Sequence, residues 1–171
     1  MNHHIIFETD RLFVRRYTEA DEENFYSLSG NEDVMRYIRP VQTKKESHAF
    51  LLENIAFYND HPLMGRWAVE EKLSGKFIGS FAIIFIPNSD KIQLGYSLKK
   101  EEWGKGYATE LSKTGFQYVF EQMNLPLIYA VTEEDNLASQ KVLLKAGFDE
   151  ESRYMLENKK AVRFIIYNLA H

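Results

Sequence analysis

The stretch Trp103-Gly104-Lys105-Gly106-Tyr107-Ala108-Thr109-Glu110 constrains the fold of this chain more than any other part of the sequence. It separates a strand pattern at residues 92–98 from a helix pattern that begins near Tyr107 and reaches about Gln122. Two glycines allow a tight turn and bring backbone N–H groups close to a ligand. The positive end of the helix dipole lies at the same place. A strand, a glycine turn and a helix N-terminus together predict an anion site, most often for phosphate.

Two better-known phosphate loops do not fit this turn. A P-loop requires Ser or Thr directly after its lysine, whereas Lys105 is followed by Gly106. The dinucleotide fingerprint requires a third glycine, and the strand patterns before the turn favour antiparallel hairpins over a βαβ unit. A turn that only caps a helix remains the alternative to an anion site.

Length and composition predict one globular domain over residues 1–171, with 44% hydrophobic residues for its core. The net charge of −4 argues against a nucleic-acid-coating surface. The absence of cysteine excludes disulfides, thiolate metal sites and a cysteine nucleophile. The five histidines show no metal-ligand spacing, so we expect no metal.

Nothing in the sequence indicates a membrane or an export signal. No window approaches the roughly 20 apolar residues of a membrane span. Residues 1–8 lack the basic start and the apolar run of a signal peptide. We therefore expect a cytoplasmic protein.

The first half of the chain reads as one strand followed by helices. Residues 11–16 form a strand pattern with Leu12 and Val14 on one face. Thr18 with Asp21 begins a helix that ends at Gly30. A short helical piece at 33–38 follows, and a capping box of Thr43 and Glu46 opens a helix that reaches about Tyr58. The predicted buried stripe of that helix is Ala49, Leu52, Ile55 and Ala56.

The second half alternates strands with helices. The predicted strands are 66–71, 76–86, 92–98, 127–131, 148–156 and 161–169, and a helix at 136–146 is closed by Gly147. Turns at 73–75 and 88–90 join the first three of these strands. The coarse order βααβββαβαββ predicts a mixed α/β (α+β) arrangement that is not doubly wound.

The glycine turn and a second motif, Asn136-x-x-Ser139-x-x-Val142-x-x-Lys145-x-Gly147-Phe148, occur in the order seen in one enzyme family. Further matches are residues 8–12, Arg15-Arg16, residues 34–38 and residues 92–96. Taken together, the chain resembles the GNAT N-acetyltransferases over nearly its whole length. Within them it is most similar to the branch that acetylates the N-termini of ribosomal proteins. The resemblance implies a mostly antiparallel sheet of about seven strands, splayed at a cofactor cleft and flanked by about four helices.

In this family the turn holds the pyrophosphate of acetyl-CoA through its backbone amides. Gly106 and Ala108 fill the small positions, and Trp103 stands where the family usually has Gln or Arg. Lys105 is either an additional cation for the pyrophosphate or a solvated loop lysine. The residues that the resemblance assigns to this contact are Trp103, Gly104, Lys105, Gly106, Tyr107, Ala108 and Thr109.

The resemblance assigns the pantetheine arm to two further segments. Pantetheine pairs like an extra strand with Tyr96, Ser97 and Leu98. Gly95 is then a bulge glycine beside the thioester, where its amide or that of Leu94 stabilises the oxyanion; an ordinary bulge is the alternative. In the second motif Asn136 contacts the pantetheine amide, Ser139 lies beside the sulfur, and Lys145 also belongs to the cofactor set. Helix capping alone would also explain Asn136 and Ser139.

The implied reaction is direct attack of a neutral amine on the thioester. Relatives often have an acidic residue at the position of Gln93, and glutamine cannot act as a base. The candidate bases are therefore Glu133, Glu134 and Asp135. The alternative for each is a solvated carboxylate without a catalytic role. Many relatives carry a tyrosine at the position of Leu143 to protonate the thiolate. Ser139 or a water is left for that role here.

An α-amine with a pKa near 7.7–8.0 needs less help from a base than a lysine with a pKa near 10.4. We therefore favour a protein or peptide N-terminus, with a polyamine, amino acid or antibiotic amine as alternatives. Arg36, Tyr37 and Arg39 follow the first helix, where this family builds its acceptor wall; plain surface charge is the alternative. A catalytically silent acyl-CoA-binding or regulatory domain is the rival function. We expect a monomer or homodimer, with neither nucleic acid nor membrane as a partner.

Overall fold

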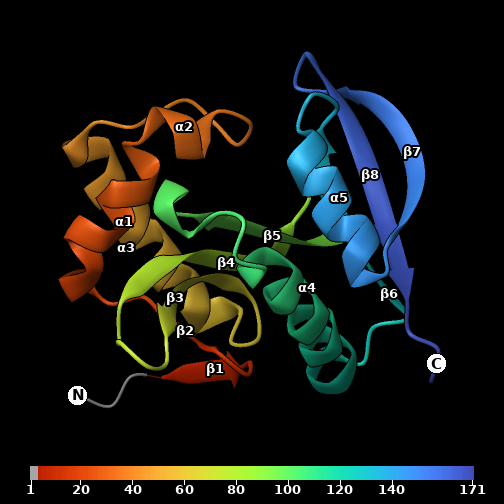
Figure 1. Ribbon diagram of the computed structural model, residues 1–171, viewed down its shortest axis with the longest axis horizontal. Coiled ribbons are helices and arrows are strands. Elements are labelled where there is room, and N and C mark those ends of the chain that lie inside the picture. Colours follow the sequence, from red (N-terminus) through yellow and green to blue (C-terminus); the bar gives the residue numbers. More distant parts are fainter. Residues whose placement is uncertain (1–3) are drawn as a thin grey trace. The chain divides into compact units, whose positions relative to one another are not determined.

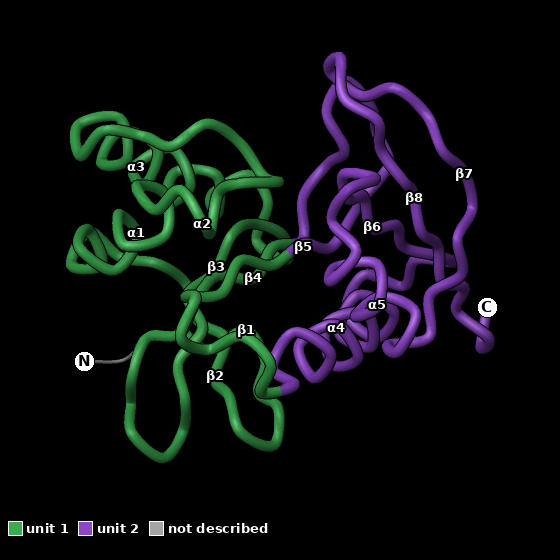
Figure 2. The backbone as a smooth tube through the Cα atoms, turned by 45° about the horizontal axis from the view of Figure 1, so that its top comes forward, with its two compact units in different colours: residues 1–82, 96–105 green, residues 83–95, 106–171 purple. Residues whose placement is uncertain are grey.

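A computed structural model of the protein describes residues 4–171. The chain forms two compact units, shown in different colours in Figure 2. Unit 1 contains the residues up to Ala82 together with Tyr96–Lys105, and unit 2 contains Ile83–Gly95 and Gly106–His171. Residues 1–3 lie outside the described part. They belong to the segment 1–8, which we predicted not to be a signal peptide. No helix of residues 4–171 is long and apolar enough to cross a membrane.

Residues 4–171 contain eight strands in one sheet of order β1-β2-β3-β4-β5-β6-β8-β7 (Figure 1). The mixed α/β prediction is confirmed, with one strand more than expected. The additional strand is β1, which pairs antiparallel with β2 and places Phe7 opposite Val14. The strands are β1 (Ile5–Glu8), β2 (Leu12–Arg16), β3 (Gly65–Glu71), β4 (Phe77–Phe85), β5 (Ile92–Leu98), β6 (Leu127–Glu133), β7 (Asp149–Leu156) and β8 (Lys159–Tyr167).

Five α-helices lie in the described part of the chain, where about four were expected: α1 (Glu22–Ser29), α2 (Glu32–Met35), α3 (Lys44–Asp60), α4 (Tyr107–Tyr118) and α5 (Leu137–Ala146). The helix start predicted at Thr18 and the capping box predicted at Thr43 both form, and each is a capping box in the structure. Thr18 and Asp21 close the 3₁₀ turn before α1, and Thr43 and Glu46 exchange hydrogen bonds at the start of α3. These local signals therefore set the helix starts as the sequence predicted.

The buried face of α3 differs from the predicted stripe. Leu52, Ala49 and Ala56 are exposed and Ile55 is half-buried. Two of the residues that are buried instead are polar: Ser47 Oγ hydrogen-bonds Ser29 Oγ at 2.6 Å, and Asn54 Nδ2 donates to the Phe50 carbonyl at 2.8 Å. A prediction from hydrophobicity alone misses a face whose polar members are paired inside the fold. The buried residues of α3 are Ser47, Leu51, Asn54 and Tyr58.

The core of unit 1 joins α1–α3 to the β-strands. Leu12 and Val14 of β2 are fully buried, as their alternation predicted. Arg15 of the same strand is also buried, and it bonds Asp21 at 2.8 Å and Glu70 at 2.7 Å. Burial disfavours the charged Asp21 carboxylate, but the hydrogen bonds from Arg15 and Thr18 outweigh this and lower the pKa of Asp21. The surrounding apolar cluster consists of Tyr17, Phe25, Leu28, Val34, Met35, Leu51, Ala68 and Phe77.

In unit 2 the strands β6, β8 and β7 pair antiparallel, and β6 pairs parallel with β5 through Gln93–Tyr129 and Leu94–Ala130. Helices α4 and α5 pack against each other (Figure 1). Phe116 of α4 meets Phe148 edge to face, with 5.9 Å between ring centroids. Beyond α4 the chain continues as a π-helical turn over Val119–Met123. The sequence prediction of one helix to about residue 122 therefore holds, apart from this change of helix type.

Candidate active site

The glycine turn has the backbone geometry that its sequence predicts. Gly104 has φ +75° and Gly106 has φ +83°, so both are left-handed. Gly106 is the N-cap of α4, and its carbonyl accepts the first intrahelical hydrogen bond from the Glu110 N–H at 3.1 Å. The N–H groups of the first helical turn have no acceptor within the helix. Together with the helix dipole they form a site that favours an anion.

Gly95 and Gly104 both have open space where a side chain would lie. Within residues 4–171, a Cβ atom built on either glycine meets no atom within 4 Å other than those of its chain neighbours. At Gly104 the left-handed backbone already favours glycine. Gly95 has no such backbone requirement, so the open space is its distinguishing feature.

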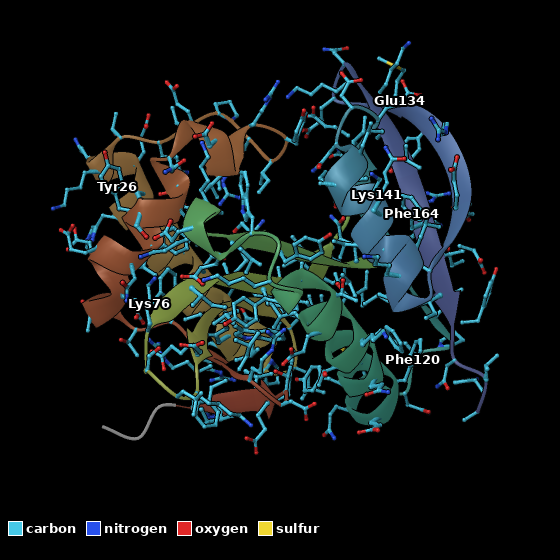
Figure 3. All side chains as sticks on the ribbon, viewed as in Figure 1. Tyr26, Lys76, Phe120, Glu134, Lys141 and Phe164 are labelled. Carbon is cyan, nitrogen blue, oxygen red and sulfur yellow. The ribbon has the colours of Figure 1, made fainter. Side chains whose placement is uncertain are left out.

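Lys105 is exposed, and its Nζ lies 2.8 Å from Glu102 Oε2. Glu102 is only 3% exposed and also contacts the Nζ of Lys76 (labelled in Figure 3) at 2.7 Å. Hydrogen bonds from Lys105 and Lys76 lower the pKa of Glu102. Two lysines thus share one buried carboxylate beside the turn.

Arg11 contacts the glycine turn, and the sequence did not indicate this contact. Its Nη1 donates a hydrogen bond of 3.0 Å to the Lys105 carbonyl, 94 residues along the chain. This bond ties the segment before β2 to the middle of the glycine turn. No sequence signal predicts a contact of this separation, whereas the i, i+3 spacing of Glu102 and Lys105 could have indicated their pairing.

The Trp103 side chain is fixed against the end of β5. Its Nε1 donates to the Leu98 carbonyl at 2.9 Å, while the side chain remains 48% exposed. Tyr96 and Ser97, predicted to pair with pantetheine, are half-buried in β5, and Leu98 is buried. Beside them lies Gly79 of β4, where an added Cβ would collide with the Ser97 carbonyl and with Leu98. Close β4 packing and the Trp103 contact therefore hold this part of β5.

The second motif begins α5 in unit 2. Asn136 is the N-cap, and its Oδ1 accepts a hydrogen bond of 3.2 Å from the Ser139 N–H. Asn136 therefore caps α5, and this role uses only the oxygen of its side-chain amide. Ser139 is half-buried in the first turn, and Lys145 is exposed in the last. Leu143, where many relatives have a tyrosine, is buried in the core.

The candidate bases Glu133 and Glu134 are both engaged in ion pairs. Glu133 at the end of β6 lies 2.7 Å from Lys159 Nζ. Glu134 (labelled in Figure 3) follows it and contacts Arg153 Nη1 at 3.0 Å. Asp135 is exposed, and Gln93 is half-buried in β5 opposite Tyr129. Neither glutamate is a free carboxylate in this structure.

The remaining turn residues occupy the first turn of α4. Tyr107 is buried, and Ala108 and Thr109 are half-buried. The Ala108 carbonyl accepts a 2.8 Å hydrogen bond from Ser112 Oγ. No group of three or more His, Asp or Glu residues within 4–171 is arranged to bind a metal ion.

Comparison with known proteins agrees with this geometry. Residues 11–149 match the acetyltransferase (GNAT) domain family. The uncharacterized N-acetyltransferase YoaA of Bacillus subtilis is 28% identical over 170 residues, covering 96% of each chain. The crystal structure of a GNAT-family acetyltransferase from Bacillus anthracis superposes with a TM-score of 0.82 at 22% identity, covering 94% of this chain and 96% of the other. RimL, a ribosomal L7/L12 α-N-protein acetyltransferase solved in complex with coenzyme A, superposes with a TM-score of 0.80 at 15% identity, covering 96% and 98%.

The chain belongs to the GNAT acetyltransferase family. It is an acyltransferase that moves an acetyl group from acetyl-CoA to an amine nitrogen, as the motifs predicted. The likeness to RimL is a likeness of fold.

Proposed function

We propose that this enzyme acetylates a primary amine directly and that its acceptor is an α-amine, most simply a peptide or protein N-terminus. The observation that supports this choice is the pairing of Glu133 with Lys159 and of Glu134 with Arg153. Both carboxylates are thus held by cationic partners, and Gln93 cannot act as a base. An α-amine is roughly a tenth neutral at pH 7, whereas only about one lysine amine in a few thousand is neutral.

In the proposed reaction the amine nitrogen attacks the thioester carbonyl carbon. A C–N bond forms, the C–S bond breaks, and the proton lost by the amine ends on the departing sulfur. The backbone amide of Leu94 or Gly95 stabilises the oxyanion, and Ser139 or a water delivers the proton. Gln93 orients the amine without accepting its proton.

Acetyl-CoA supplies the activated acetyl group, and the protein contacts the cofactor at several points along the cofactor's length. We propose that the amides of residues 104–109 bind the pyrophosphate, with Lys105 as an additional cation. Main-chain groups of residues 96–98 pair with pantetheine, and the Nδ2 group of Asn136 donates to a pantetheine carbonyl.

We further propose that both compact units belong to one catalytic domain spanning residues 1–171. The family match supports this, because residues 11–149 include parts of both units. The chain acts as a monomer or homodimer, which sedimentation at micromolar concentration distinguishes.

The test is release of free CoA thiol with two peptides of one sequence context. One peptide has a free N-terminus and no lysine, and the other has a blocked N-terminus and one internal lysine. We expect the free N-terminus to be preferred at pH 7 by roughly 300-fold in kcat/KM, the ratio of the neutral amine fractions. Equal use of the lysine peptide would contradict the α-amine choice. Tight CoA binding without thiol release for peptides, polyamines, amino acids or aminoglycosides would instead support a silent acyl-CoA-binding domain.

The pH dependence gives an independent check on the base. We expect kcat/KM of the free-N-terminus peptide to rise with the ionisation of its own α-amine, near pH 8. Glu133→Gln and Gln93→Ala should keep this profile. An additional ionisation that disappears in Glu133→Gln would identify Glu133 as the general base and overturn this part of the proposal.

A further inference from the structure

Two half-buried arginines of unit 1 lie over one aromatic ring. Arg39 belongs to the segment between α2 and α3, and Arg66 belongs to β3. The guanidinium carbon of Arg39 lies 4.7 Å from the centroid of the Phe50 ring, and that of Arg66 lies 5.1 Å from it. Segments that are far apart in the sequence thus bring two positive charges to the same side chain of α3.

Neither guanidinium has a counter-ion within residues 4–171. Arg66 Nη1 donates to the neutral Asn54 Oδ1 at 3.3 Å, and Arg39 Nε is buried without a hydrogen-bond partner. Arg15 of the same unit, which is fully buried, contacts both Asp21 and Glu70 instead. Half-buried Arg16 lies over the Tyr58 ring and donates to the Pro62 carbonyl, so what distinguishes Arg39 and Arg66 is that two such cations share one ring.

The electrostatics of the pair are unfavourable. Burial, followed by repulsion from Arg66, lowers the pKa of Arg39 to about 10. Burial also lowers the pKa of Arg66. Guanidinium groups stay protonated at neutral pH. Stacking on Phe50 offsets part of the cost of burying the two cations but does not neutralise their charge.

We propose that Arg39 and Arg66 together bind an anionic group of the acceptor, a carboxylate or a phosphate, and so restrict the substrates to acidic amines. This inference rests on the proposed function, because the anion belongs to the molecule that carries the amine. Guanidinium groups match both anions through paired N–H donors. Arg39 also lies in the segment that the resemblance assigns to the acceptor wall. A polyamine or an aminoglycoside is disfavoured, because its positive charges would be repelled by both arginines.

The kinetic test compares acceptors that differ only in an anionic group. Ala-Glu-amide is compared with Ala-Gln-amide for the carboxylate, and Ala-phosphoserine-amide with Ala-Ser-amide for the phosphate, so that the α-amine is held constant. We expect the preferred anion to raise kcat/KM by about 10- to 100-fold. Arg39→Met and Arg66→Met should each bring that ratio close to one while leaving CoA affinity unchanged. Lys45→Met, which removes one exposed cation of α3, is the charge-matched control and should keep the wild-type ratio.

A binding test separates this inference from the proposed function. Thermal unfolding is measured with saturating CoA, so that the glycine turn is occupied, in phosphate, succinate or chloride at equal ionic strength. We expect phosphate or succinate to raise the Tm of the wild type and of Lys45→Met, but not of Arg39→Met or Arg66→Met. If no peptide is acetylated, the proposed function fails while this binding result still decides the anion site.

Two results would overturn the inference. One is equal use of the charged and neutral peptides by the wild type together with no anion-dependent rise in Tm. The other is an anion preference that survives in both methionine variants. If a methionine variant does not fold, Arg39→Lys or Arg66→Lys replaces it. These variants keep the charge but lose the paired donors, so a reduced preference is expected, and an unchanged one counts against the inference.

Discussion

Asn136 Oδ1 accepts a hydrogen bond of 3.2 Å from the backbone N–H of Ser139 and thereby closes the first turn of α5. The Oδ1 atom of Asn136 is thus used for helix capping, and its Nδ2 group is the part that we assign to acetyl-CoA. The two roles can be separated, because serine caps a helix about as well as asparagine but lacks an amide group.

Asn136→Ser should leave the free energy of unfolding within about 0.5 kcal/mol of the wild type. CoA affinity should fall about fivefold, the value of one lost hydrogen bond. Urea unfolding and calorimetric titration with CoA measure the two effects. Asn136→Ala is the companion variant, and it should lose about 1 kcal/mol of stability as well as affinity. An unchanged CoA affinity in Asn136→Ser would leave Asn136 as a cap only.

Gly104→Ala should weaken CoA binding, because a left-handed alanine strains the turn and its methyl group occupies the space left for the ligand. Gly75→Ala is a matched control: it has φ +68°, open space around its Cβ, and a position in the turn between β3 and β4. Both variants should lose about 1–2 kcal/mol of stability. Only Gly104→Ala should lose CoA affinity in titration. Equal CoA affinities in the two variants would remove the turn from the donor site.

Gly95→Ala should keep its stability, since the backbone angle is ordinary and the added methyl meets no protein atom within 4 Å. We expect kcat/KM to fall by about 100-fold if the methyl displaces the thioester from its reactive position. Thiol-release kinetics beside a thermal unfolding curve give both values. Wild-type kinetics would show that Gly95 is an ordinary strand glycine.

Tyr58→Phe should change how stability depends on alkaline pH. Burial raises the pKa of Tyr58 to about 12, so the folded state keeps the neutral phenol that the unfolded chain loses near pH 10. The corresponding stability is fully present below pH 10 and is lost as the pH rises towards 12, by about 2–3 kcal/mol. Urea unfolding at pH 9, 10.5 and 11.5 should show a shallower decline in Tyr58→Phe than in the wild type. Parallel declines would contradict this assignment.

The features that the sequence predicted correctly depend on neighbouring residues. The glycine turn, the helix starts at Thr18 and Thr43 and most strands follow from spacing over a few residues, and the structure contains them. The strand at Ile5–Glu8 was missed because four residues at a chain end carry too little periodicity. The α3 face was misplaced because its polar residues pair with partners outside the helix.

The site features that the sequence did not predict depend on long-range contacts. Glu102 meets Lys76 across 26 residues, and Arg11 reaches the Lys105 carbonyl across 94. Arg39 and Arg66 were not recognised as a pair, because only the fold brings both of them to Phe50. Charge compensation is a property of the folded arrangement, so its absence at this pair could not be seen in the sequence.

The glycine turn also affects how such an enzyme can diversify. Its contact with the donor is assigned mainly to main-chain groups and to two left-handed glycines. The anion-binding arginines are encoded elsewhere, at positions 39 and 66, so a substitution there can change acceptor preference without altering the turn. A few mutations can therefore change the acceptor of such an enzyme while its contact with acetyl-CoA stays the same.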